Sequence, residues 1–349
     1  AFALVPCAML VATSCGDPDS DADEKPATQQ PGTPGNNADN GAGDQPDTPG
    51  TPDTPGKATF ALGADISWLS EMESNGVKFY DTSGQEQDCM ALLKAMGCTA
   101  IRLRVWVNPT GGWNGKNDVV AKAKRVKAQG MDLMVDFHYS DTWADPGKQQ
   151  TPAAWKGMST TQMCEALANH TKDVLGALKA EGIDVRWVQV GNETTIGMLF
   201  PAADIVNGGA AAQAAYARFF NAGAKAAKEI YPDAKTIVHV DRGQKADVTC
   251  WSLDILKNNG GNWDITGISL YPATAWQADE SACAANVRQL IARYGKPVIL
   301  AETGFARNHS QADKYLKQLR SDMQTIDQCM GIFYWEAEDY KGWNGGYSM

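Results

Sequence analysis

Two glutamates occupy positions where a pair of carboxyl groups can do chemistry. Glu193 and Glu302 each stand at the end of a short apolar run. Carboxyl groups about 5 Å apart cleave glycosidic bonds with retention: one carboxylate attacks the anomeric carbon, and one carboxylic acid protonates the leaving oxygen. We expect an arginine to keep Glu302 ionised. A less polar setting and the charge of Glu302 should keep Glu193 protonated.

Further polar and aromatic side chains stand at the ends of other apolar runs. Those with expected binding roles are Asp65, Arg104, His138, Trp143, Asn192, Tyr271 and Trp335. Each has a structural alternative, such as a buried ion pair, a loop cap or core packing, and the two readings of Asp65 are equally supported. Arg102 lies two residues from Arg104, and we expect it to point to the opposite face of its strand as a structural residue.

The elements that must position these residues begin near Phe60, where β-branched runs alternate with amphipathic stretches. Eight units in strict alternation favour a parallel sheet that closes into a barrel, so the predicted fold class is α/β, a (β/α)₈ TIM barrel with its active site at the carboxyl ends of the strands. Glycines at 97, 130, 182 and 295 follow helical stretches, where a left-handed residue is expected. The expected strands are 60–65, 100–106, 132–138, 186–190, 236–240, 265–270, 297–300 and 332–335, and the expected helices are 85–96, 119–129, 161–181, 210–230, 248–258, 281–294 and 311–327.

The chain divides into three predicted parts: residues 1–15, 16–56 and a catalytic domain over 57–349. Because the sequence stops soon after the eighth strand, we expect the eighth helix to be missing. Residues 1–15 are apolar but shorter than the roughly 20 residues of a membrane span. They are typical of a signal-sequence remnant, and residues 12–15 resemble a bacterial lipobox, with Cys15 as the acylated residue; the alternative is an ordinary secretory signal with an incidental cysteine. Either reading predicts export, as an outer-membrane or cell-surface lipoprotein or else as a periplasmic or secreted protein.

Most of the net charge of −10 lies in residues 16–56, which contain nine acidic residues and a single basic residue, Lys25. This Pro/Gly-rich segment has little to bury and is predicted to be a disordered spacer. The remaining charge of −2 leaves no basic stripe for phosphates, which argues against nucleic acid as a partner. We expect a monomer that contacts a membrane only through the lipid anchor.

Six cysteines lie beyond the N-terminal region, at positions 89, 98, 164, 250, 283 and 329. In an exported chain an even number permits three disulfides, and free buried thiols are the alternative. Their spacing contains no Cys-x-x-Cys pair and no His/Cys cluster, which argues against a zinc site. We expect no cofactor.

The catalytic motifs resemble a known family. Residues 190–193 (VGNE) and 301–304 (AETG) resemble the catalytic pattern of clan A glycoside hydrolases. Four further motifs resemble glycoside hydrolase family 53, the endo-β-1,4-galactanases, and the similarity runs from about Phe60 to the C-terminus. These motifs are 63–68 (GADISW), 101–109 (IRLRVWVNP), 137–147 (FHYSDTWADPG) and 333–336 (FYWE).

The resemblance implies endo-hydrolysis of β-1,4-galactan, the side chain of pectic arabinogalactan type I, with Glu193 as acid/base and Glu302 as nucleophile. It places Asn192 at the sugar 2-hydroxyl and Trp335 under the reactive sugar, with Arg104, His138 and Tyr271 around the nucleophile. Some relatives bind calcium through an acidic loop after strand seven; residues 305–310 carry no carboxylate, so we expect no metal there. The alternatives are another clan A β-glycanase, such as a β-mannanase or β-1,4-glucanase, and a non-catalytic surface glycan-binding protein.

Overall fold

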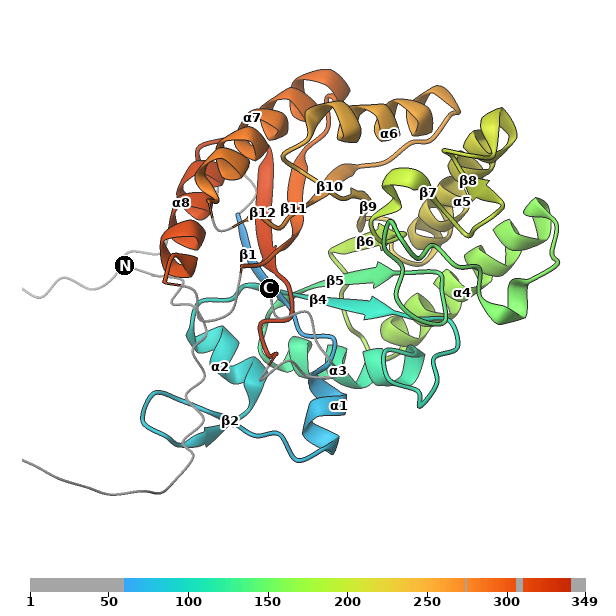
Figure 1. Cartoon of the computed structure of the whole chain (residues 1–349). Coiled ribbons are helices and arrows are strands. Elements are labelled where there is room, and N and C mark those ends of the chain that lie inside the picture. Colours follow the sequence, from blue (N-terminus) through green and yellow to red (C-terminus); the bar gives the residue numbers. More distant parts are fainter. Residues whose placement is uncertain (1–59, 274, 306–309, 340–349) are drawn as a thin grey trace, which may run out of the picture. The chain divides into compact units, whose positions relative to one another are not determined.

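The computed structural model describes residues 60–339 apart from 274 and 306–309. Eight parallel strands form a closed barrel that helices surround, which confirms the predicted fold class (Figure 1). The first strand pairs with both the second and the last strand of the barrel, so no edge is left unpaired. The barrel strands are β1 (Ala61–Asp65), β4 (Ala100–Val105), β5 (Asp132–Phe137), β6 (Trp187–Val190), β9 (Lys235–Val240), β10 (Ile265–Leu270), β11 (Val298–Thr303) and β12 (Cys329–Tyr334).

Each of the seven predicted helices is present, and the four glycines expected after helices have φ between 61° and 94°. A short helix, α1, lies in the loop after β1 and was not predicted. Within the described residues, which end at Asp339, no helix follows β12. The helices are α1 (Leu69–Ser74), α2 (Cys89–Ala95), α3 (Lys116–Ala128), α4 (Thr160–Ala180), α5 (Gly209–Ile230), α6 (Ala246–Asn258), α7 (Gln277–Tyr294) and α8 (Ala312–Gln324).

The predicted helix over 85–96 is wrong at its start. Residues Glu86–Gln87 form strand β3, which pairs with β2 (Phe79–Tyr80) in a small antiparallel sheet. The helix begins only after Asp88, whose carboxylate accepts a hydrogen bond of 2.9 Å from the backbone N–H of Ala91. This N-cap sets the true start of α2. A second small sheet joins β7 (Gly197–Met198) to β8 (Ala203–Asp204).

The barrel interior has an apolar layer toward the amino ends of the strands and a polar layer toward their carboxyl ends. Apolar side chains such as Met134, Trp187 and Phe333 form a buried cluster inside the barrel. Gly63 leaves room for this cluster, since a Cβ at that position would lie 2.2 Å from the ring of Phe333. Above it, the inward positions of the same strands carry buried polar groups, which places hydrogen-bonding side chains at the mouth of the barrel.

The cysteines resolve one of the open alternatives. Cys98, Cys164, Cys250, Cys283 and Cys329 are thiols and form no disulfide. Residues 1–59, with the predicted signal remnant, Cys15 and spacer, lie outside the described residues, as does most of the 305–310 loop. None of the described helices is long and apolar enough to cross a bilayer.

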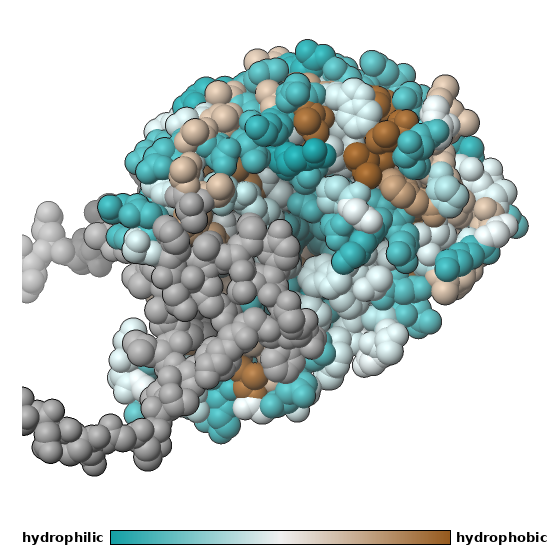
Figure 2. Space-filling model, viewed as in Figure 1, coloured by the Kyte–Doolittle hydropathy of each residue, from teal (hydrophilic) through white to brown (hydrophobic). Residues whose placement is uncertain are grey.

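The described surface is largely hydrophilic on the face shown in Figure 2, with apolar residues in small groups. Among the described residues, the large hydrophobic side chains that are clearly exposed are Met96, Val206 and Trp251. They belong to three different segments of the chain.

Candidate active site

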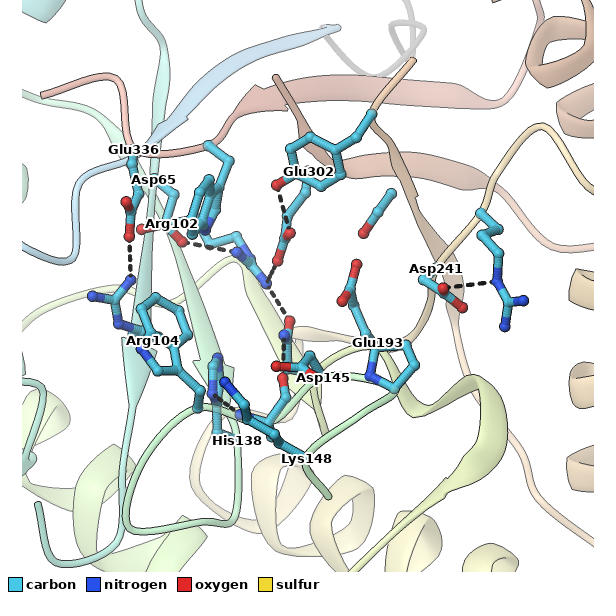
Figure 3. Close-up of a pocket in the computed structure, with 18 of the residues that line it drawn as sticks. Asp65, Arg102, Arg104, His138, Asp145, Lys148, Glu193, Asp241, Glu302 and Glu336 are labelled. Atoms are coloured by element: carbon cyan, nitrogen blue, oxygen red, sulfur yellow. Dashed lines mark hydrogen bonds and ion pairs between the residues drawn. The ribbon is translucent and has the colours of Figure 1, made fainter. Parts of the chain in front are cut away.

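A pocket of about 640 Å³ opens at the carboxyl ends of the strands (Figure 3). All nine residues predicted to act in catalysis or binding line it, so the structure brings together side chains from seven barrel strands and the loops that follow them. The pocket also holds residues that sequence reasoning left out of the site. These are Trp68, Arg102, Ala144, Asp145, Pro146, Lys148, Asp241, Arg242, Gln244, Ser269 and Glu336.

Arg102 is the central cation of the pocket, so the expectation that it points away from the site is wrong. Residues two apart on a strand share a face, and both Arg102 and Arg104 therefore point into the barrel. The Arg102 guanidinium lies 2.8 Å from carboxylate oxygens of Asp65, Asp136 and Glu302. Burial opposes its charge, but the three carboxylates outweigh burial and raise the pKa of Arg102. The arginine expected beside Glu302 is thus Arg102.

Arg104 has different surroundings from those predicted. Its Nη1 donates a 2.9 Å hydrogen bond to Glu336 Oε1. Its guanidinium carbon lies 4.3 Å from the ring centre of Trp68 and 4.2 Å from that of Trp143, which is a cation–π arrangement. Arg104 therefore holds an aromatic wall and Glu336 in place, while Arg102 contacts the predicted nucleophile.

Glu302 reaches the pocket because of an irregularity in β11. The pairing with β10 skips one residue, so that Ile268 faces Leu300 but the next residue, Ser269, faces Glu302. Such a bulge re-aims a side chain. Ala301 packs in the inner apolar cluster, and Glu302 also points inward. The register shift is what places this carboxylate at the barrel mouth.

The surroundings of Glu302 have opposing effects on the pKa of its carboxyl group. Burial raises the pKa of its carboxyl above the usual value, while the Arg102 guanidinium limits that rise. The Tyr271 hydroxyl also acts against the rise, by donating a 2.8 Å hydrogen bond to Oε2. One carboxylate oxygen thus contacts Arg102 and the other contacts Tyr271, a setting that favours the ionised form.

Glu193 lies three residues beyond the end of β6 and adopts a left-handed backbone conformation with φ of 44°. Its side chain points toward the centre of the pocket, as does that of Glu302 (Figure 3). Burial, and next the negative charge of Glu302, raise its pKa well above the usual value. Glu302 has a guanidinium at 2.8 Å, whereas none of the described residues forms an ion pair with Glu193, so Glu302 is the first of the pair to ionise.

Asn192 connects the loop that carries Glu193 to neighbouring segments through hydrogen bonds. Its Oδ1 accepts from Arg102 at 2.8 Å and from Gln189 at 3.0 Å, and its Nδ2 donates to the carbonyl of Ala144 at 2.8 Å. All its hydrogen-bonding atoms therefore have protein partners. The residue orients Arg102 and the loop that carries Glu193.

His138 forms a hydrogen bond with Asp136. Its Nδ1 faces two N–H donors, the Trp106 indole at 3.2 Å and the Ala144 backbone at 3.1 Å. The hydrogen of a neutral ring is therefore on Nε2, which lies 3.0 Å from Asp136 Oδ2. Asp136 in turn binds Arg102, which binds Glu302, so two residues lie between His138 and the predicted nucleophile along these contacts.

Aromatic rings enclose one side of the pocket. Trp335 lies 6.0 Å from Trp143 and meets Tyr271 edge-on at 6.1 Å, measured between ring centres. Such rings offer apolar faces next to the carboxyl groups. Among the described residues, no group of three His, Cys, Asp or Glu side chains is arranged to hold a metal ion.

Comparison with known proteins identifies the family. The sequence profile of glycosyl hydrolase family 53 matches residues 61–325. The probable arabinogalactan endo-β-1,4-galactanase A of Neosartorya fischeri is 36% identical over 248 residues, which cover 69% of this chain and 68% of that protein. The endo-β-1,4-galactanase of Bacillus subtilis is 32% identical over 76% of this chain and 62% of that protein. A solved structure from a study of two fungal β-1,4-galactanases has a TM-score of 0.74 at 30% identity, covering 82% of this chain and 90% of that one. The chain belongs to glycosyl hydrolase family 53.

Proposed function

We propose that this chain is a retaining endo-β-1,4-galactanase in which Glu302 is the nucleophile and Glu193 the general acid/base. The unequal surroundings of the two glutamates carry this proposal. Glu302 contacts Arg102 and the Tyr271 hydroxyl, whereas burial and the charge of Glu302 keep Glu193 protonated. Double displacement requires this division between an anion and an acid.

The proposed reaction proceeds in two balanced steps. The Glu302 carboxylate attacks the anomeric carbon while Glu193 gives its proton to the leaving glycosidic oxygen, which releases one part of the chain and leaves a glycosyl ester on Glu302. Ionised Glu193 then takes a proton from water as the water oxygen attacks the same carbon. The ester bond breaks, Glu302 leaves as a carboxylate, and Glu193 is protonated again.

The substrate part of the proposal draws on the relatives, whose names specify galactan. Trp143 and Trp335 in the pocket supply ring faces that suit the apolar faces of sugar rings. A panel of polysaccharides separates the alternatives. We expect new reducing ends from β-1,4-galactan and none from β-mannan or β-1,4-glucan; cleavage of another β-glycan with galactan left intact would overturn the substrate assignment. A non-catalytic binder would release no products from any of them.

We further propose that the barrel is an exported monomer anchored through an acylated Cys15, with residues 16–56 as the spacer. The proposal rests on the lipobox-like residues 12–15 and on the acidic, Pro/Gly-rich composition that follows. In cells, replacement of Cys15 by Ser should move the protein from the membrane fraction to the soluble fraction. An unchanged distribution would contradict the anchor.

A further inference from the structure

One buried side-chain amide contacts the main chain on both sides of Glu193. Gln149 Nε2 donates a hydrogen bond of 2.8 Å to the backbone carbonyl of Asn192 and one of 3.3 Å to that of Glu193. The amide nitrogen of glutamine has two hydrogens, and both partners are carbonyl oxygens, which only accept, so these contacts fix the orientation of the amide. Gln149 is 3% exposed, and water therefore has little access to replace it.

The two carbonyls belong to the two peptide groups that flank the Cα atom of Glu193. The backbone angles φ and ψ describe how these two peptide planes are rotated about that atom, and they have the left-handed values of 44° and 52° at Glu193. A residue with a side chain rarely adopts this conformation and keeps it where neighbouring groups hold it. Because the two planes determine the direction of the Cα–Cβ bond, the Gln149 amide helps to set where the Glu193 carboxyl group lies.

Gln149 is itself held in place on the loop between β5 and α4. Its backbone carbonyl accepts a 2.7 Å hydrogen bond from the N–H of Phe200. The carbonyl of Ala144, on the same loop, accepts a 2.8 Å hydrogen bond from Asn192 Nδ2. The loop therefore binds the segment that carries Glu193 through a side chain of its own and through its main chain.

We propose that Gln149 is a positioning residue for Glu193, whose carboxyl group it holds within reach of the glycosidic oxygen and of the attacking water. Gln149 does not line the pocket that the described residues form, whereas Asp145 and Lys148 of the same loop do (Figure 3). Its effect on the reaction therefore passes through the residues that it holds. This inference rests on the proposed role of Glu193.

The test measures Gln149→Met, which keeps the size of the side chain but has no hydrogen to donate, on two substrates. Galactan leaves as a sugar alkoxide that needs a proton, whereas the phenolate of a 2,4-dinitrophenyl β-1,4-galactobioside leaves without one. We expect kcat/KM on galactan to fall about 10-fold or more, because general acid catalysis supplies roughly 10²–10⁴-fold and depends on the placement of the acid. On the dinitrophenyl galactobioside, kcat/KM should stay close to the wild-type value.

The second step of the reaction gives an independent measurement. Because dinitrophenolate leaves readily, hydrolysis of the glycosyl ester limits the turnover of this substrate, and that hydrolysis needs Glu193 as a base. In Gln149→Met, kcat on the dinitrophenyl galactobioside should fall, and KM should fall with it as the ester accumulates. Azide attacks without a base, so it should restore turnover and give the β-galactobiosyl azide.

Controls separate positioning from a loss of folded protein. Gln150→Met changes the neighbouring glutamine, whose side chain is exposed on the same loop, and should keep wild-type kinetics without a response to azide. The ratio of the two kcat/KM values in one sample does not depend on the fraction of enzyme that is folded. If Gln149→Met does not fold, Gln149→Glu serves for the same measurements, because its carboxylate has the same shape and no hydrogen for the two carbonyls.

The outcomes distinguish this inference from the proposed function. Suppose that the wild type cuts galactan and that Glu193→Ala loses this activity and responds to azide. If Gln149→Met then keeps wild-type kinetics, or loses kcat/KM equally on both substrates without a response to azide, the positioning role is wrong and the role of Glu193 stands. A wild type that cleaves neither substrate, or a Glu193→Ala variant that azide does not accelerate, overturns both.

Discussion

At the scale of single residues, one arginine organises the site. Arg102 binds carboxylates from β1, β5 and β11 and the amide of Asn192, so it joins four segments of the chain at one guanidinium. The types and positions of Glu193 and Glu302 were predictable from the sequence, because each stands near the carboxyl end of a barrel strand. It was not predictable from the sequence that Arg102 contacts Glu302 while Arg104 contacts Glu336. The two-residue repeat of a strand does, however, place both arginines on the same face of β4.

Replacing Arg102 by Lys tests this organisation. A lysine ammonium cannot reproduce the forked contacts, so Asp65, Asp136 and Glu302 would share a weaker and less well placed cation. We expect kcat/KM on galactan to fall about 100-fold or more, in the range seen when one charge-stabilising contact is removed. The pKa of Glu302 should rise, and the acidic limb of the pH profile should therefore move to higher pH.

A matched control for this variant is Arg125→Lys. Arg125 also binds two carboxylates, those of Glu73 and Asp88, but it lies on α3 away from the pocket. It should keep the wild-type pH profile. A wild-type acidic limb in Arg102→Lys would show that the guanidinium does not hold Glu302 ionised.

At the scale of elements, periodicity predicted the barrel strands and seven helices because both types of element bury one face. It missed α1 and the two small sheets, which have only two to six residues each and too few turns or alternations to show a pattern. It also missed the bulge in β11. A skipped pairing depends on the neighbouring strand, and no property of residues 298–303 alone shows it.

Closure of the barrel gives an element-scale prediction. Gly63 on β1 lies so close to Phe333 on β12 that a methyl group at this position would overlap the ring. Gly63→Ala should lower the free energy of unfolding by about 1–3 kcal/mol, the usual effect of overpacking a core. Gly176→Ala is the matched control, because this glycine lies inside α4 with open space around its Cβ position. It should raise stability by roughly 0.5–1 kcal/mol. Denaturant unfolding of both variants would measure this, and an unchanged stability of Gly63→Ala would contradict the packing at this contact.

The contact between α7 and α8 predicts a pH dependence of stability. Burial and the neighbouring Asp322 raise the pKa of Glu280 to about 7. A carboxyl whose pKa is raised on folding stabilises the protein while it is protonated, so this contribution is present below about pH 4.5 and is lost as the pH rises through 7. Glu280→Gln stays neutral at every pH in this range.

The Tm of Glu280→Gln should therefore fall less between pH 5 and 8 than that of the wild type. Glu165→Gln, an exposed position on α4, serves as the control and should follow the wild type. Parallel Tm curves for the wild type and Glu280→Gln would show that Glu280 does not titrate in this range.

At the scale of the whole molecule, the charge is unevenly distributed. Residues 16–56 hold −8 of the net −10. A segment of this composition has too little apolar surface to offset the entropy of ordering, and composition alone therefore predicts that the N-terminal region is separate from the barrel. The internal arrangement of the barrel depends on tertiary contacts, which composition does not reveal.

Removal of residues 1–56 tests this separation. We expect the shortened protein to unfold at the same Tm and to hydrolyse soluble galactan with the same kcat/KM as the full chain. Calorimetry and reducing-end assays measure both quantities. A lower Tm or a loss of activity would show that the N-terminal region stabilises the barrel.

The most direct test of the central claim is to identify the residue that forms the covalent intermediate. A 2-deoxy-2-fluoro galactobiosyl fluoride forms the ester quickly and hydrolyses it slowly, because the fluorine destabilises both transition states while fluoride leaves readily. Mass spectrometry of the digested protein should find the added sugar on Glu302, and Glu302→Ala should remain unlabelled and inactive. A label on another residue, or undiminished turnover in Glu302→Ala, would contradict the assignment.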